Sequence, residues 1–210
     1  MKKIAFVCKN MTQIGGKERI LIDTVRLLMT DYDVTIITFT QPASFYLETL
    51  KGVKLDVISV DPFLATGLFN RISNIGRSIR DLRRYFKLND NYSKIICVDA
   101  IITVLLFMIF SIRKKLFAWE HMSFFDPVTT TKFKIIKKIV YKRLQGVIVL
   151  TKYDYELLTN EKFRVFLIPN FVTTQEINLC DISDKHVVFI GRYDYQKGFD
   201  YLGDIIKITS

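Results

Sequence analysis

The sequence predicts an α/β protein built on a doubly wound parallel sheet. Short apolar runs rich in β-branched residues alternate with longer segments of helical periodicity over residues 3–172. This alternation is typical of βαβ units with right-handed crossovers. At 210 residues, half of them apolar and a quarter charged, the chain can bury a sizeable core and is unlike a disordered protein.

Apolar runs bounded by glycine, proline or polar residues are predicted to be the strands. They lie at residues 3–9, 33–39, 53–60, 94–98, 116–119, 146–150 and 164–168. Runs of this length suit buried strands better than helices.

Helices are expected between these strands. They are placed at residues 18–29, within 41–51, at 72–88, 100–112 and 131–144, and after Thr151. Thr151 is the expected N-cap of its helix, with Asp154 at the capping-box position. Residues 100–112 are apolar all round, which fits a helix covering the sheet, and the run is shorter than the roughly 20 residues that span a bilayer.

Two of the expected helices are strongly basic. In the helix at 72–88, the predicted inward residues are Ile72, Ile75, Ile79, Leu82, Tyr85 and Phe86, and the outward cations are Arg71, Arg77, Arg80, Arg83, Arg84 and Lys87. In the helix at 131–144, the inward residues are Phe133, Ile136, Ile139, Val140 and Leu144, and the outward ones are Lys132, Lys134, Lys137, Lys138, Lys142 and Arg143. Each basic face is either solvated or rests on an anionic membrane surface.

The formal charge of +10 indicates an anionic partner: nucleotide phosphates, acidic lipid or nucleic acid. The chain carries no recognisable nucleic-acid module, so we expect no nucleic acid among its partners. Three scattered cysteines give neither metal-ligand spacing nor a disulfide framework. With no secretory signal after Met1, we expect a cytoplasmic protein, either free or peripheral at the inner face of the cell membrane.

A candidate phosphate site lies near the end of the chain. The apolar run at 187–190 reads as a strand, Arg192 and Lys197 follow it, and helical spacing begins after Gly198. Arg192 could bind phosphate oxygens bidentately, Lys197 could add a point charge, and the helix start offers free N–H groups. The alternative is a solvated basic loop.

Residues 191–199, Gly-Arg-Tyr-Asp-Tyr-Gln-Lys-Gly-Phe, resemble the loop that opens the second domain of glycosyltransferase family 4. The resemblance implies a retaining enzyme with the two-Rossmann GT-B fold. It implies a nucleotide-sugar donor, such as a UDP- or GDP-hexose, and no cofactor or metal. In that family the arginine and lysine of this loop bind the donor diphosphate, and these roles fall on Arg192 and Lys197.

Two further segments carry the resemblance. Residues 15–19, Gly-Gly-Lys-Glu-Arg, resemble a family motif whose glycines let the loop backbone approach sugar and acceptor. Gly15 and Gly16 alone could equally serve a plain turn. Glu120 and His121 follow a predicted strand at its carboxyl end, where parallel sheets bind ligands. The resemblance places Glu120 in the sugar and acceptor cleft and makes His121 the catalytic residue contacting the transferred sugar, whereas a lone histidine would more often be structural.

The resemblance spans the whole chain but only about half of a family member. It divides the chain into an acceptor-side domain at 1–172, a linker at 173–185 and the incomplete start of a donor-binding domain at 186–210. The family's ribose-holding pair of glutamates has no counterpart after Glu176. We therefore expect a truncated or partial hexosyltransferase, inactive alone, acting on a glycan or lipid-linked acceptor. The alternative is a non-catalytic acceptor-binding or membrane-docking half of a split enzyme, completed by a separate carboxy-terminal half.

Overall fold

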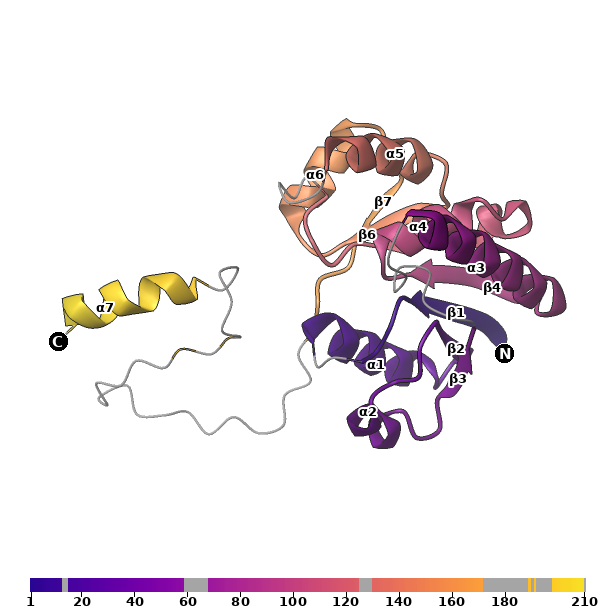
Figure 1. Cartoon of the computed structure of the whole chain (residues 1–210), viewed down its shortest axis with the longest axis horizontal. Helices are drawn as coiled ribbons and strands as arrows, with labels where there is room; N and C mark the ends of the chain where they lie inside the picture. The colour runs from indigo at the N-terminus through magenta and orange to yellow at the C-terminus, as the bar shows by residue number, and fades with distance from the viewer. Residues whose placement is uncertain are drawn as a thin grey trace. The chain divides into compact units, whose positions relative to one another are not determined.

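The computed structural model describes residues 1–12, 15–58, 68–124, 130–171, 189, 191 and 198–209. The chain divides into two compact units, Met1–Thr173 and Thr174–Ser210. The first unit contains a seven-stranded sheet in the order β3-β2-β1-β4-β5-β6-β7, with every neighbouring pair parallel. The predicted doubly wound parallel sheet is therefore confirmed (Figure 1).

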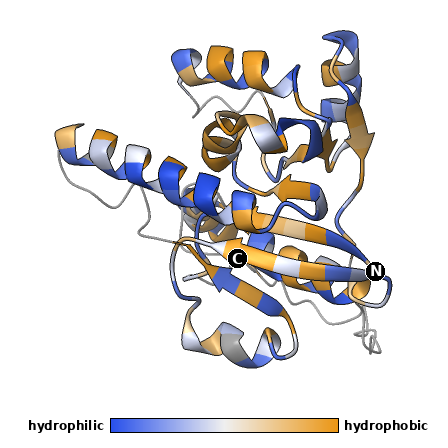
Figure 2. Ribbon diagram, turned by 90° about the vertical axis from the view of Figure 1, so that its right-hand side faces the viewer, coloured by the Kyte–Doolittle hydropathy of each residue, from blue (hydrophilic) through white to orange (hydrophobic). Residues whose placement is uncertain are grey.

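Each predicted apolar run of the first unit coincides with a strand. The strands are β1 (Lys2–Cys8), β2 (Tyr32–Thr38), β3 (Lys54–Val57), β4 (Tyr92–Cys97), β5 (Leu116–Trp119), β6 (Gly146–Val149) and β7 (Val165–Leu167). Figure 2 shows hydrophobic residues concentrated along these strands, as expected for a sheet buried on both faces. The order of the sheet reverses between β1 and β4, so their carboxyl ends form the topological switch point.

Helices cover both faces of the sheet. They are α1 (Gly16–Leu28), α2 (Ser44–Thr49), α3 (Leu68–Leu88), α4 (Ala100–Phe107), α5 (Thr131–Tyr141) and α6 (Lys152–Asn160). Helices α1 and α2 lie on one face with a core that includes Phe6 and Ile36, and α3 to α6 lie on the other with a core that includes Leu82 and Leu106 (Figure 1). The predicted N-cap is confirmed, because Thr151 Oγ1 accepts the backbone N–H of Asp154 at 3.1 Å.

The prediction of one continuous helix over residues 100–112 is wrong in its second half. Helix α4 ends at Phe107, and a 3₁₀ helix, η1 (Phe110–Lys115), follows it. The Arg113 side chain donates to the Phe107 carbonyl at 2.5 Å, and its guanidinium lies 3.6 Å from the Phe110 ring centroid. Arg113 thus occupies a carbonyl at the end of α4 and stabilises the chain reversal there.

The predicted facing of two helices also needs correction. In α5, Lys137 is only 4% exposed, while Ile136 and Ile139 are 46% and 51% exposed. Ile72 in α3, predicted to face inward, is likewise exposed. The α5 helix is rotated from its apolar periodicity because Lys137 meets a buried carboxylate, that of Glu120.

The second unit contains a 3₁₀ helix, η3 (Phe199–Tyr201), and helix α7 (Leu202–Thr209). Gly198 before them has φ 68°, a left-handed conformation that favours glycine. The expected linker at 173–185, most of the strand expected at 187–190, and both Arg192 and Lys197 lie outside the described residues. Across the described ranges, no helix combines the length and the apolarity needed to cross a membrane.

Candidate functional site

The candidate site lies where β1, β4 and β5 end, at the switch point of the sheet. Gly15 and Gly16 lead from β1 into α1, Asp99 follows β4, and Glu120 and His121 follow β5. The structure thus brings the predicted glycine pair and the predicted histidine to one edge. Arg192 and Lys197 belong to the second unit and are outside the described residues, so their diphosphate-binding role stays a prediction.

Gly15 and Gly16 do not adopt the left-handed backbone conformation that would require glycine. Gly15 is the N-cap of α1 with φ −144° and ψ 159°, an extended conformation open to any residue. Gly16 is the first residue of α1, and among the described residues a Cβ built on it meets no atom within 4 Å outside the backbone of its own helix and its chain neighbours. Backbone conformation therefore does not explain this pair, and Gly16 leaves open space at the start of the helix.

Asp99 links three elements at this edge. Its Oδ2 accepts the backbone N–H of Lys9 at 2.6 Å, and its Oδ1 lies 2.7 Å from Lys17 Nζ in the first turn of α1. Its carbonyl accepts the Thr103 hydroxyl of α4 at 2.9 Å. Sequence reasoning missed both Asp99 and Lys17. The available signal was the position of Asp99 directly after a strand at the switch point.

His121 is partly buried against Trp119, with the two ring centroids 4.5 Å apart. Its Nε2 is buried and has no hydrogen-bond partner among the described residues. Burial and then the positive charge of Lys17 lower the pKa of His121 to about 4, against the opposing effect of Asp99. At neutral pH the imidazole is therefore uncharged, and its buried Nε2 leaves one hydrogen-bonding position unfilled among the described residues.

Glu120 is directed into the core rather than toward His121. Its side chain is nearly fully buried, Oε2 lies 2.6 Å from Lys137 Nζ, and Oε1 accepts the Tyr141 hydroxyl. Successive residues at a strand end point to opposite faces, so His121 and Trp119 share one face and Glu120 takes the other. In this structure the Glu120 carboxylate therefore anchors the strand end, and the cleft role implied by the resemblance stays a prediction.

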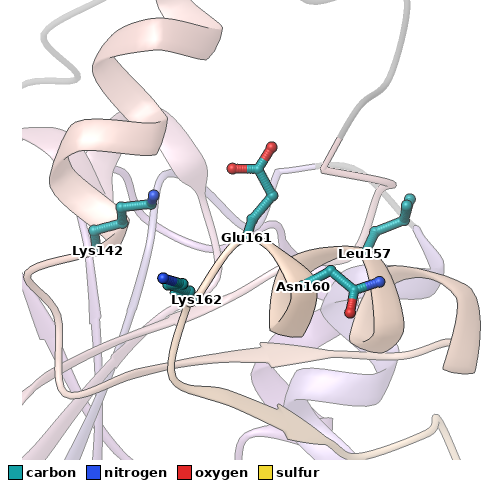
Figure 3. Close-up of a pocket in the computed structure, with 5 residues that line it drawn as sticks. All are labelled: Lys142, Leu157, Asn160, Glu161 and Lys162. Atoms are coloured by element: carbon teal, nitrogen blue, oxygen red, sulfur yellow. The ribbon is translucent and has the colours of Figure 1, made fainter.

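A separate hollow of about 520 Å³ lies where α5 and α6 end (Figure 3). It is lined by Lys142, Leu157, Asn160, Glu161 and Lys162. Its carboxylate, Glu161, already pairs with Lys138 at 2.5 Å. None of its lining residues belongs to the edge that carries His121, so it forms no part of the candidate site.

No family profile matches the chain. An uncharacterised glycosyltransferase of Haemophilus influenzae is 26% identical over 216 residues, which include 100% of this chain and 59% of that protein. The chain therefore spans less than two thirds of this relative's length.

Several solved structures resemble the chain. HepE of Anabaena, crystallised with UDP and glucose, matches 81% of this chain and 44% of its own at 14% identity and a TM-score of 0.58. Sucrose-phosphate synthase of Thermosynechococcus elongatus matches 80% and 48% at 11% identity and a TM-score of 0.60. The first unit has a Rossmann-like GT-B fold. A third GT-B neighbour, Phytolacca americana UGT2 in complex with UDP-2-fluoro-glucose and pterostilbene, matches 84% and 55% at 12% identity and a TM-score of 0.57.

Proposed function

We propose that this chain is the acceptor-side part of a retaining glycosyltransferase that uses a nucleotide-sugar donor. The observation that carries the proposal is His121: at the switch-point edge of a GT-B sheet, it is a neutral imidazole whose buried Nε2 has no hydrogen-bond partner in the described part of the chain. The likeness to the Haemophilus glycosyltransferase supports the same reading, as do the nucleotide and sugar ligands bound in two of the similar structures.

In the proposed reaction, the bond between the anomeric carbon and the donor diphosphate breaks, and a bond from that carbon to an acceptor oxygen forms. The acceptor proton passes to the departing diphosphate. His121 would bind a sugar hydroxyl, and the space at Gly16 would admit sugar or acceptor beside the start of α1. Arg192 and Lys197 would stabilise the diphosphate charge, as fixed cations do most effectively in a preorganised site.

Nucleotide binding by the chain is the first test. Two charged contacts of roughly 1.5–3 kcal/mol each give at best millimolar affinity after the cost of association. Calorimetric titration with UDP and GDP should therefore show weak binding that Arg192→Ala abolishes. Micromolar affinity, or turnover of a nucleotide-sugar by the chain alone, would contradict the assignment of the chain as a part of the enzyme.

Turnover is the second test, in the chain joined to the carboxy-terminal remainder of the Haemophilus relative. Nucleotide release from UDP- or GDP-hexose should fall with His121→Ala. Gly16→Ala is the matched variant, because its added methyl has room among the described residues, so lost turnover would report space used by the ligand. A folded, nucleotide-binding fusion whose turnover is unaffected by both changes would refute the site.

We also propose that α5 rests on an anionic membrane surface, which favours a lipid-linked acceptor. Its exposed Ile135, Ile136 and Ile139 lie beside the exposed cations Lys132 and Lys142. Such a mixed face suits the headgroup region. Binding to anionic vesicles should weaken steeply with salt, since exposed charges are screened over roughly 10 Å at 0.1 M. Equal binding to neutral vesicles would count against this proposal.

A further inference from the structure

We propose that Lys17 and Asp99 are a positioning pair for the sugar-transfer site. Their ion pair fastens the start of α1 to the end of β4 and sets a fixed positive charge beside His121. The inference rests on the proposed function for the identity of the site, but its geometry is independent of any substrate.

The fastening comes from one carboxylate that holds two chain segments. Asp99 Oδ1 lies 2.7 Å from Lys17 Nζ, and Oδ2 accepts the Lys9 backbone N–H at 2.6 Å. The two side chains are only 27% and 18% exposed, so solvent competes weakly for these charge-assisted bonds. Because Lys9 directly follows β1 and Lys17 is the second residue of α1, Asp99 restrains both ends of the connection that leads to the glycine pair.

The fixed charge comes from Lys17. Burial lowers the pKa of the Lys17 ammonium group. The charge and hydrogen bond of Asp99 outweigh burial, with a smaller contribution from Glu18, so the pKa of Lys17 is raised. Among described groups, Lys17 from α1 and Asp99 from the end of β4 are the charges that act on His121. Glu120, next in sequence, faces the other side of the sheet and is paired with Lys137.

The consequence for His121 is a ring that stays neutral. Burial alone disfavours the imidazolium form, and the Lys17 ammonium adds to that effect. A neutral imidazole suits the hydroxyl groups of a sugar and gives no attraction to a carboxylate. The Lys17 charge, partly offset by Asp99, would therefore favour an uncharged, hydroxyl-bearing ligand beside the ring.

Proton NMR of the imidazoles tests the pair directly, since the chain has only two histidines. His186→Gln assigns the His121 signal. In the unmodified chain, His121 should stay neutral down to about pH 5 and titrate near 4. Lys17→Met should move this midpoint upward, and Lys17→Arg should restore a low midpoint because it keeps the charge.

Amide hydrogen exchange gives a second readout that does not depend on the titration. Asp99→Ala removes the acceptor of the Lys9 N–H, so exchange at Lys9 should accelerate while Trp119 emission stays native. Lys138→Met is the matched control, because it deletes a lysine from an exposed ion pair with Glu161 and should leave His121 unchanged.

An unchanged His121 midpoint in folded Lys17→Met would overturn the pair, and so would unchanged Lys9 exchange in Asp99→Ala. Neither measurement uses a nucleotide-sugar. A chain that passes both tests while its fusion shows no sugar turnover would refute the proposed function and leave the positioning pair standing.

Discussion

Loss of the Lys137 ammonium should be the most damaging single polar change in the first unit. Lys137→Met leaves the Glu120 carboxylate buried with the Tyr141 hydroxyl as its remaining partner. Breaking a buried ion pair by removing one member costs about 3–5 kcal/mol, because the other charge stays desolvated. That loss is a large fraction of the about 5–15 kcal/mol that stabilises a typical domain.

Urea unfolding followed by tryptophan fluorescence measures this cost. Trp119 is the only tryptophan in the chain, and it is 5% exposed in the first unit next to Glu120. Its emission therefore reports the unit that contains the pair. The double variant Glu120→Gln, Lys137→Met should recover much of the lost stability, since no unpaired charge remains in the core.

The Lys138–Glu161 pair supplies the comparison, because it also joins α5 to a neighbouring segment but its side chains are 44% and 36% exposed. Lys138→Met should cost at most about 1 kcal/mol, as exposed pairs usually do. Equal costs for the two lysine variants would refute the assignment of Glu120 and Lys137 as a buried anchor of the β5 end.

Three further predictions concern stability. The free energy of unfolding should fall as pH drops from about 6.5 toward about 4, because the unfolded histidine binds a proton in this range and native His121 does not. The loss is at most about 3 kcal/mol. The urea midpoint of His121→Phe should not show this part of the pH dependence. Lys162 follows the end of α6 with a left-handed φ of 62°, and its backbone N–H donates to the Thr159 carbonyl at 2.9 Å. Lys162→Gly keeps this N–H and should relieve the strain of the left-handed conformation. It should raise the thermal midpoint by an amount equivalent to about 1 kcal/mol, and a lowered midpoint would contradict the strain. Leu106→Ala should cost about 2–5 kcal/mol in urea, since Leu106 is fully buried in the core beneath α4; a cost below about 1 kcal/mol would argue against that core.

The sheet was predictable because its strands are signalled locally. Short apolar runs such as residues 146–150 are bounded by turn residues, and the structure places β6 there. The facing of α5 was not predictable from periodicity, because Lys137 is turned inward by Glu120, 17 residues earlier. The end of α4 depends on the side chain of Arg113, which binds a carbonyl six residues back.

The candidate site was predictable only in part, for a similar reason. The Gly-Gly-Lys-Glu-Arg motif pointed to Gly16, and the position after a predicted strand pointed to His121. The pair formed by Lys17 and Asp99 joins residues 82 positions apart, and no local pattern reports such a contact. The diphosphate-binding role of Arg192 and Lys197 stays a prediction.

The strand order has a consequence for how the protein is made. The central strand β1 pairs with β2 and with β4, and the site bond between Lys9 and Asp99 joins residues 90 positions apart. At about 5–20 residues per second, several seconds of synthesis separate the emergence of β2 from that of β4. During that interval β1 has emerged from the ribosome, but one of its two hydrogen-bonding edges has no partner strand. An unpaired edge of this kind can pair with the wrong strand or with another chain. Strand β1 is thus completed late, and the edge that carries His121 assembles only after β4 and β5 have been translated.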